Sequence, residues 1–121
     1  MTTATTAALL EHDREINDAI LNGQALKAFE AYYADNIVMR ENDGEETVGK
    51  DANRLREAAF FDAITEFRGA RVLASGAGDN TTFSHWYFDF THRDWGERRY
   101  HQVAVREWHD GRVVRETFYY G

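Results

Sequence analysis

Residues 105–121 read "VREWHDGRVVRETFYYG", and this stretch decides the fold that we expect. Apolar and polar side chains alternate on both sides of a central His109, Asp110 and Gly111. A period of two residues is typical of β-strands, and Asp-Gly between two such runs is a hairpin signal. The C-terminal part of the chain is therefore expected to be an antiparallel hairpin.

The same alternation extends towards the N-terminus. Residues 67–75 ("FRGARVLAS"), 81–92 ("TTFSHWYFDFTH") and 98–108 ("RRYHQVAVREW") read as strands, and "GAGDN" and "RDWGE" separate them. Together with residues 112–121, they predict a four-stranded antiparallel meander.

Ahead of the strands, the apolar period changes to that of helices. Thr6 is placed to cap a first helix, which carries Leu9, Ile16 and Ile20 and stops at the "NG" of residues 22–23. A second helix, with Leu26, Phe29 and Tyr33, is expected to end at residues 35–36, before a short strand over residues 37–41.

A third helix is expected after residue 50. Asp51 lies at or beside its N-terminus, where a carboxylate complements the unpaired backbone amides. The expected buried stripe consists of Ala52, Leu55, Ala59 and Ala63, flanked by Phe60 and Ile64. Three helices followed by strands predict one α+β domain over residues 1–121, a cone of helices packed on one face of a curved antiparallel sheet.

The composition limits the classes of partner. The chain of 121 residues carries a net charge of −7, which disfavours nucleic acid and anionic membranes, since both need a basic surface. There is no cysteine, which excludes disulfides and thiol ligands and fits a cytoplasmic location. Aromatic residues make up 14%, enough for a filled core or for a pocket that takes an apolar ligand.

One short motif suggests a different function. Residues 44–51, "GEETVGKD", come within one letter of a phosphate-binding loop, G-x-x-x-x-G-K-[ST]. Asp51 replaces the hydroxyl that would bind Mg²⁺, and Glu45 and Glu46 would repel a polyanion. We therefore expect no nucleotide binding.

The last strand contains one acid among apolar residues. Glu116 shares its predicted face with Val114, Phe118 and Tyr120, and such a carboxylate needs a partner or a neutralising environment. In the strand of residues 81–92, the wholly apolar set is Trp86, Phe88 and Phe90, which we expect to face the helices.

The order of these motifs resembles the nuclear transport factor 2-like superfamily, in its SnoaL-like polyketide cyclase and ketosteroid isomerase branch. "FEAYYADNIVMREN", "GKDANRLREAAF" and "VREWHDGRVVRETFYYG" carry the resemblance, which covers almost the whole chain. It implies a cystatin-like α+β roll whose mouth opens to an apolar pocket.

The resemblance also implies site residues. Glu41 falls where the isomerases keep their carboxylate base. Ile16 and Ala104 stand where they place the two donors that bind the developing oxyanion, so steroid isomerisation is not expected. The cyclases often have a histidine in the position of Glu116.

Arg106 is the candidate that could replace the missing donors. It lies across the hairpin from Glu116, and the two form either a structural ion pair, the reading we favour, or a site that binds a substrate carboxylate or enolate. The candidate catalytic residues are Glu41 and Arg106. The candidate pocket residues are Met39, Trp86, Phe88, Tyr100, Gln102, Trp108, Glu116, Phe118 and Tyr120.

Two classes of function follow for this fold. The first is a cofactor-independent enzyme that moves a proton on an apolar carbonyl compound, in the isomerase, cyclase or dehydratase style. The second is a non-catalytic ligand-binding protein or dimeric scaffold, and the sequence leaves open whether the domain is catalytic.

The remaining expectations concern metals and assembly. No metal site is expected, because the histidines form no ligand cluster, and His85 and His101 are assigned to the outer face of the sheet. Trp95 is read as a turn anchor or as part of an association surface. Val103, Val105, Val113 and Tyr119 make the outer face mixed, which suits an isologous homodimer.

Overall fold

The computed structural model describes residues 5–121 as three helices on a six-stranded sheet. The helices are α1 (Thr6–Leu21), α2 (Ala25–Tyr32) and α3 (Lys50–Asp62). The strands are β1 (Tyr33–Glu41), β2 (Thr47–Val48), β3 (Ile64–Gly78), β4 (Thr81–His92), β5 (Gly96–His109) and β6 (Arg112–Tyr119). The α+β fold expected from the sequence is confirmed.

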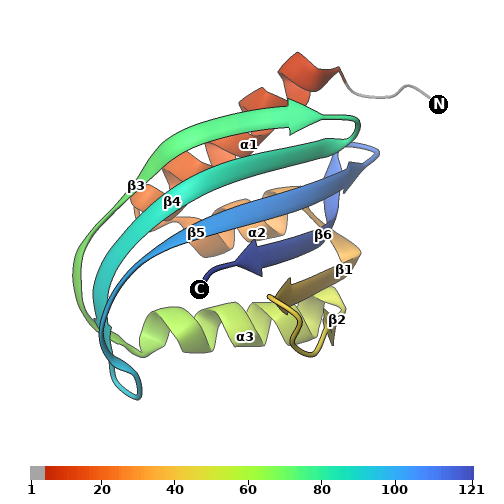
Figure 1. Ribbon diagram of the computed structural model, residues 1–121. Coiled ribbons are helices and arrows are strands. Elements are labelled where there is room, and N and C mark those ends of the chain that lie inside the picture. The colour runs from red at the N-terminus through yellow and green to blue at the C-terminus, as the bar shows by residue number, and fades with distance from the viewer. Residues whose placement is uncertain (1–4) are drawn as a thin grey trace.

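The sheet has the strand order β2-β1-β6-β5-β4-β3. The meander from β3 to β6 is antiparallel, as predicted, but β1 pairs in parallel with β6, so the sheet is mixed. Figure 1 shows the long strands β3, β4 and β5 curving around the helices. Three register shifts in β3 contribute to this curvature, because a bulge bends a strand.

Two boundaries near the N-terminus differ from the sequence prediction. Thr5, rather than Thr6, caps α1, and its side chain accepts a hydrogen bond from the backbone N–H of Ala8 at 3.1 Å. Tyr33 begins β1 instead of ending α2. Its ring is buried and its hydroxyl reaches β6, a contact that holds the residue in the sheet.

The buried stripe predicted for α3 is wrong for Ala52, Leu55 and Ala59, which are exposed, and right only for Ala63. Leu55 is 72% exposed, whereas Asn53 is fully buried. The side-chain nitrogen of Asn53 donates to the carbonyl oxygens of Ile37, Thr47 and Gly49, at 3.2, 2.9 and 2.8 Å. Polar anchoring to β1 and β2, rather than an apolar stripe, therefore sets the face that α3 turns inwards.

Val113 is also placed differently from the prediction. It is fully buried in the core with Leu9, Ile37 and Met39, although the alternation assigned it to the outer face. Pairing shifts between Glu107 and Trp108, at the start of the closing hairpin, and β1 then covers Val113 through its partner Tyr33. The local pattern could not show either event.

Four other residues that the sequence assigned to the outer face of the sheet do lie there. Val103 and Tyr119 are 37% and 45% exposed, and the rings of His85 and His101 meet there at 2.9 Å between Nε2 and Nδ1. No helix within residues 5–121 has both the length and the apolar character needed to span a membrane.

Candidate active site

A cavity of about 780 Å³ lies between the concave face of the sheet and the helices. Its aromatic wall includes Trp86 and Phe88, whose rings stack with centroids 5.1 Å apart. Phe60 on α3 and Tyr100 on β5 add to the lining. This volume is in the range of sites that hold small organic molecules.

The structure places most of the predicted site residues around this one cavity. Glu41 and Arg106 line it, together with Met39, Trp86, Phe88, Tyr100, Gln102, Glu116, Phe118 and Tyr120. The two positions that lack the isomerase donors, Ile16 and Ala104, line it as well. The predicted residues that line the cavity thus come from four strands, β1, β4, β5 and β6.

Trp108 is the exception, because it packs in the core instead of lining the cavity. The alternation along β5 continues to Trp108, which is buried on the same face as Gln102 and Arg106, but it follows Arg106 along the strand and lies beyond the cavity lining. The indole Nε1 of Trp108 donates to the hydroxyl of Thr82 at 2.9 Å, and its ring packs near Tyr32.

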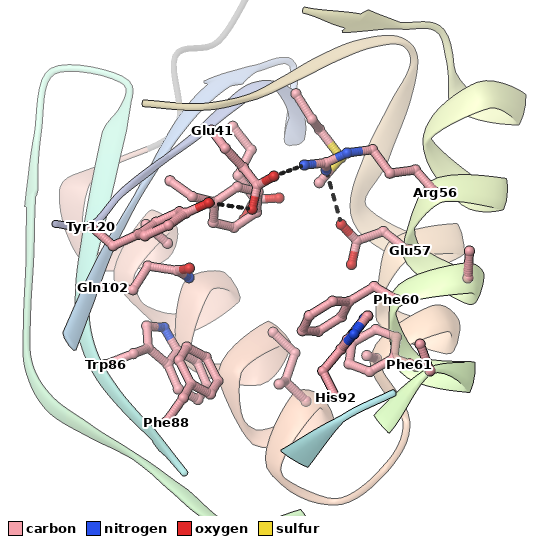
Figure 2. A pocket seen from close by; sticks show the side chains of 18 of the residues that line it. Glu41, Arg56, Glu57, Phe60, Phe61, Trp86, Phe88, His92, Gln102 and Tyr120 are labelled. Carbon is pink, nitrogen blue, oxygen red and sulfur yellow. Dashed lines mark hydrogen bonds and ion pairs between the residues drawn. The ribbon is translucent and has the colours of Figure 1, made fainter. Parts of the chain in front are cut away.

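Charged side chains meet at one side of the cavity, as Figure 2 shows. One carboxylate oxygen of Glu41 accepts from the guanidinium of Arg56 at 2.7 Å, and the other accepts from the hydroxyl of Tyr120 at 3.2 Å. Arg56 also lies 3.7 Å from the carboxylate of Glu57. Both carboxylate oxygens of Glu41 therefore accept a hydrogen bond. The contact between Glu57 and Arg56 is the longest of the three.

Glu57 has the properties of a group that exchanges protons near neutral pH. Burial raises its pKa from the ordinary value of 4.5 to about 7, and the negative charge of Glu116 adds to this effect. Arg56 acts in the opposite direction. Carboxyl groups with such a pKa are often functional, because they can both take and give a proton at physiological pH.

The sequence reasoning missed both Arg56 and Glu57. A signal was present, since Asn53, Glu57 and Phe60 follow one another at helical spacing and all turn inwards on α3. Two of the three are polar, and a stripe of alanine and leucine on another face had the stronger apolar pattern.

At the closed end, Arg106 is bound between two carboxylates. Its Nε donates to Glu116 at 2.7 Å, and its Nη1 donates to Asp13 at 2.7 Å and to the amide oxygen of Asn17 at 2.9 Å. All three charged side chains are about 2% exposed. The structure thus contains the Arg106–Glu116 pair expected across the hairpin and adds Asp13 from α1.

Neutral donors complete the shell around these carboxylates. The hydroxyls of Thr82 and Ser84 each donate to Asp13 at 2.8 Å, and the hydroxyl of Tyr33 donates to Glu116 at 2.6 Å. Burial raises the pKa of the Tyr33 phenol well above its usual value, and Glu116 contributes. Tyr33 therefore stays protonated and remains a donor. Since two carboxylates already flank Arg106, it is poorly suited to bind an anionic substrate group.

His92 and Trp95 form another part of the cavity lining. The ring of His92 stacks on Trp95 with centroids 3.7 Å apart, and its Nδ1 accepts from the backbone N–H of Asp94 at 3.1 Å. Trp95 is thus folded back from the turn onto the sheet. Residues 5–121 contain no group of three or more His, Cys, Asp or Glu that could hold a metal ion.

Known proteins share this architecture. A family model for the SnoaL-like domain matches residues 14–116. A structure from Mesorhizobium loti assigned to the SnoaL-like polyketide cyclases has a TM-score of 0.83 and 22% identity, over 93% of this chain and 98% of its own. One with the same assignment from Jannaschia sp. CCS1 has a TM-score of 0.82 and 8% identity, over 99% and 90%.

A third structure has another named activity. An LEH-like epoxide hydrolase from M. tuberculosis matches with a TM-score of 0.78 and 13% identity, over 96% of this chain and 84% of its own. No curated protein sequence matches the chain. At these identities the structural likenesses show the fold alone.

Proposed function

The chain belongs to the SnoaL-like domain family, and from that membership we propose that it is a cofactor-independent enzyme that moves a proton on an apolar carbonyl compound. The observation that carries the proposal is the position of Glu57, a carboxyl group with a pKa of about 7 on the wall of a largely aromatic cavity. Its environment suits the general base and acid of one reaction.

The proposed step is enolisation. The ionised carboxylate of Glu57 takes a proton from the carbon next to the substrate carbonyl, the C–H electron pair forms a carbon–carbon double bond, and the carbonyl π pair moves to oxygen. Protonated Glu57 then returns the proton to the same or another carbon. No electron acceptor is needed, so the step balances without a cofactor.

Glu41, the base suggested by the family resemblance, has a different part in this proposal. Arg56 and Tyr120 occupy both of its oxygens, and its charge contributes to the raised pKa of Glu57. We propose Glu41 as the group that fixes Arg56 and tunes Glu57, and Arg106 as structural. If Glu41 is itself the base, Glu41→Gln will lower the catalysed rate more than Glu57→Gln does.

Hydrogen exchange tests the proposal without knowledge of the natural substrate. In D₂O, the wild type is expected to accelerate loss of the α-hydrogen NMR signals of 1-tetralone and 2-acetylnaphthalene. The rate should rise with pH through about 7, as Glu57 ionises. Glu57→Gln should lower the catalysed rate roughly 10²- to 10⁴-fold.

A matched control for this assay is Glu45→Gln, which removes a carboxylate from an exposed loop. It should exchange at the wild-type rate. Equal exchange rates for wild type and Glu57→Gln would contradict the proposed role of Glu57. A wild-type rate equal to that of buffer alone would contradict the proposal that the protein is an enzyme.

The alternative is a protein of the same fold that binds an apolar small molecule without chemistry. The stacked Trp86 and Phe88 favour it, because they offer a flat apolar surface to a ligand. Ketone binding without acceleration of exchange would select this alternative.

We also propose that the protein is a homodimer through the outer face of the sheet. Leu73, Phe83, Val103 and Tyr119 are 44%, 40%, 37% and 45% exposed. In a monomer this patch would face water, which an isologous interface avoids. Light scattering at micromolar concentration should give about twice the mass of the 14.0 kDa chain. A monomeric mass at every concentration would overturn the dimer.

A further inference from the structure

Two neutral hydrogen-bond donors on the cavity wall have no partner among residues 5–121. The side chains of Trp86 and Gln102 are almost completely buried, with 1% and 9% exposed, and both line the cavity. Neither the indole N–H of Trp86 nor the amide of Gln102 makes a hydrogen bond to another group of residues 5–121, and both side chains line the cavity rather than being sealed in the core. Trp108, by contrast, satisfies its indole N–H with Thr82 at 2.9 Å.

The two donors come from adjacent strands. Trp86 on β4 and Gln102 on β5 are directly opposite each other in the antiparallel ladder. Side chains in this relation have Cβ atoms about 5 Å apart. Figure 2 shows the amide end of Gln102 pointing into the cavity, with the indole nitrogen of Trp86 on the side of its ring nearest to Gln102.

A buried polar group without a partner is costly, and it needs a reason or a ligand. Water can hydrogen-bond to the two donors when no ligand is bound, but an apolar substrate would displace it. The donors would then be left unpaired unless the ligand supplied an acceptor. This requirement selects a ligand that has an oxygen acceptor on an otherwise apolar body.

We propose that the Trp86 N–H and the Gln102 amide bind the carbonyl oxygen of the substrate. This proposal rests on the proposed carbonyl chemistry. It supplies donors for the carbonyl oxygen, which Ile16 and Ala104 in the same cavity cannot offer from their side chains. Arg56 and Arg106 also line the cavity but already donate to Glu41 and Glu116, whereas the uncharged donors of Trp86 and Gln102 can bind an oxygen without breaking an ion pair.

The location of Glu57 fits this arrangement. It projects from α3, and Figure 2 shows it across the cavity from Gln102 and Trp86. A carbonyl oxygen held at the sheet would turn its neighbouring carbon towards the helix that carries the acid–base group. Trp86 and Gln102 are thus binding and positioning residues, while Glu57 moves the proton.

Two probes of the same shape test the donor pair. The first is 2-acetylnaphthalene, and the second is 2-isopropenylnaphthalene, in which a CH₂ group replaces the carbonyl oxygen. Calorimetry measures the Kd of each. The ratio of the hydrocarbon Kd to the ketone Kd reports the hydrogen bonds and cancels changes in packing that affect both probes.

Gln102→Leu is expected to lower this ratio about tenfold, and Trp86→Phe about three- to tenfold, the size of one or two lost hydrogen bonds. The carbonyl stretch of bound 2-acetylnaphthalene should move to higher frequency in both variants. Gln24→Leu, at an exposed position, is the matched control and should leave the ratio unchanged.

Stability provides a second readout that does not depend on a ligand. Because Gln102 has no side-chain partner in the described part of the chain, Gln102→Leu should keep or raise the midpoint of thermal unfolding, whereas loss of an internal hydrogen bond would lower it. A ratio unchanged within about twofold in both variants, or no ketone binding by the wild type, would overturn the donor pair. Exchange activity is read separately, so the enzyme and the donor pair can fail independently.

Discussion

Arg106→Met is expected to destabilise the protein by roughly 3–5 kcal/mol, since it leaves two buried carboxylates without their cation. Asp13 and Glu116 each lie 2.7 Å from the guanidinium, and their side chains are about 2% exposed. Total stabilities of domains are about 5–15 kcal/mol, so this single change removes a large part. Urea unfolding at neutral pH measures the loss.

A double-mutant cycle shows whether the charges act on each other. Glu116→Gln should cost less, roughly 1–3 kcal/mol, because Asp13 still pairs with Arg106 and the amide can still accept from Tyr33. The double variant should be more stable than the sum of the single changes predicts, by about 1–3 kcal/mol. Additive costs would mean that Arg106 and Glu116 do not interact.

The matched control lies on the same strand. Arg99 pairs with Asp89 at 3.2 Å, but its side chain is 51% exposed. Arg99→Met should cost less than about 1 kcal/mol, because exposed ion pairs contribute little. A cost similar to that of Arg106→Met would indicate that burial is not the cause.

The sequence predicted the closing hairpin, whose two strands are close neighbours along the chain. We predicted the Arg106–Glu116 pair from the closing hairpin, but the "HDG" turn alone would place Arg115 opposite Arg106. The register shift between Glu107 and Trp108 brings Glu116 opposite Arg106 instead. Asp13 reaches the same guanidinium from α1, 93 residues away, and no spacing in the sequence announces that contact. The parallel pairing of β1 with β6 is equally non-local.

The strand residues of the cavity lining were predictable from the sequence, whereas Glu57 on α3, the proposed acid–base group, was not. Strand alternation gave Trp86, Phe88 and Gln102, but a helix can turn any of several faces inwards. Asn53 decides the face of α3 through three carbonyl oxygens that only the folded chain brings together. Glu57 enters the cavity as a consequence of that anchor.

Glu57→Gln is expected to make the protein more stable above pH 7 while lowering its activity. The folded protein holds the proton of Glu57 up to about pH 7, whereas the unfolded chain releases it near 4.5. Between these values the folded state binds more protons, so this group makes stability fall as pH rises. The fall is on the order of 3 kcal/mol, at about 1.4 kcal/mol per pH unit.

The glutamine variant cannot ionise and therefore lacks this fall. Its free energy of unfolding should match that of the wild type near pH 4, apart from small packing changes, and exceed it by up to about 3 kcal/mol at pH 8. Glu45→Gln, in the exposed loop, should keep the wild-type pH profile. A stability gain at pH 8 together with lost hydrogen exchange would mean that the fold tolerates an unfavourable carboxylate for its chemistry. Parallel profiles for wild type and Glu57→Gln would show instead that the carboxylate reaches water and has no raised pKa.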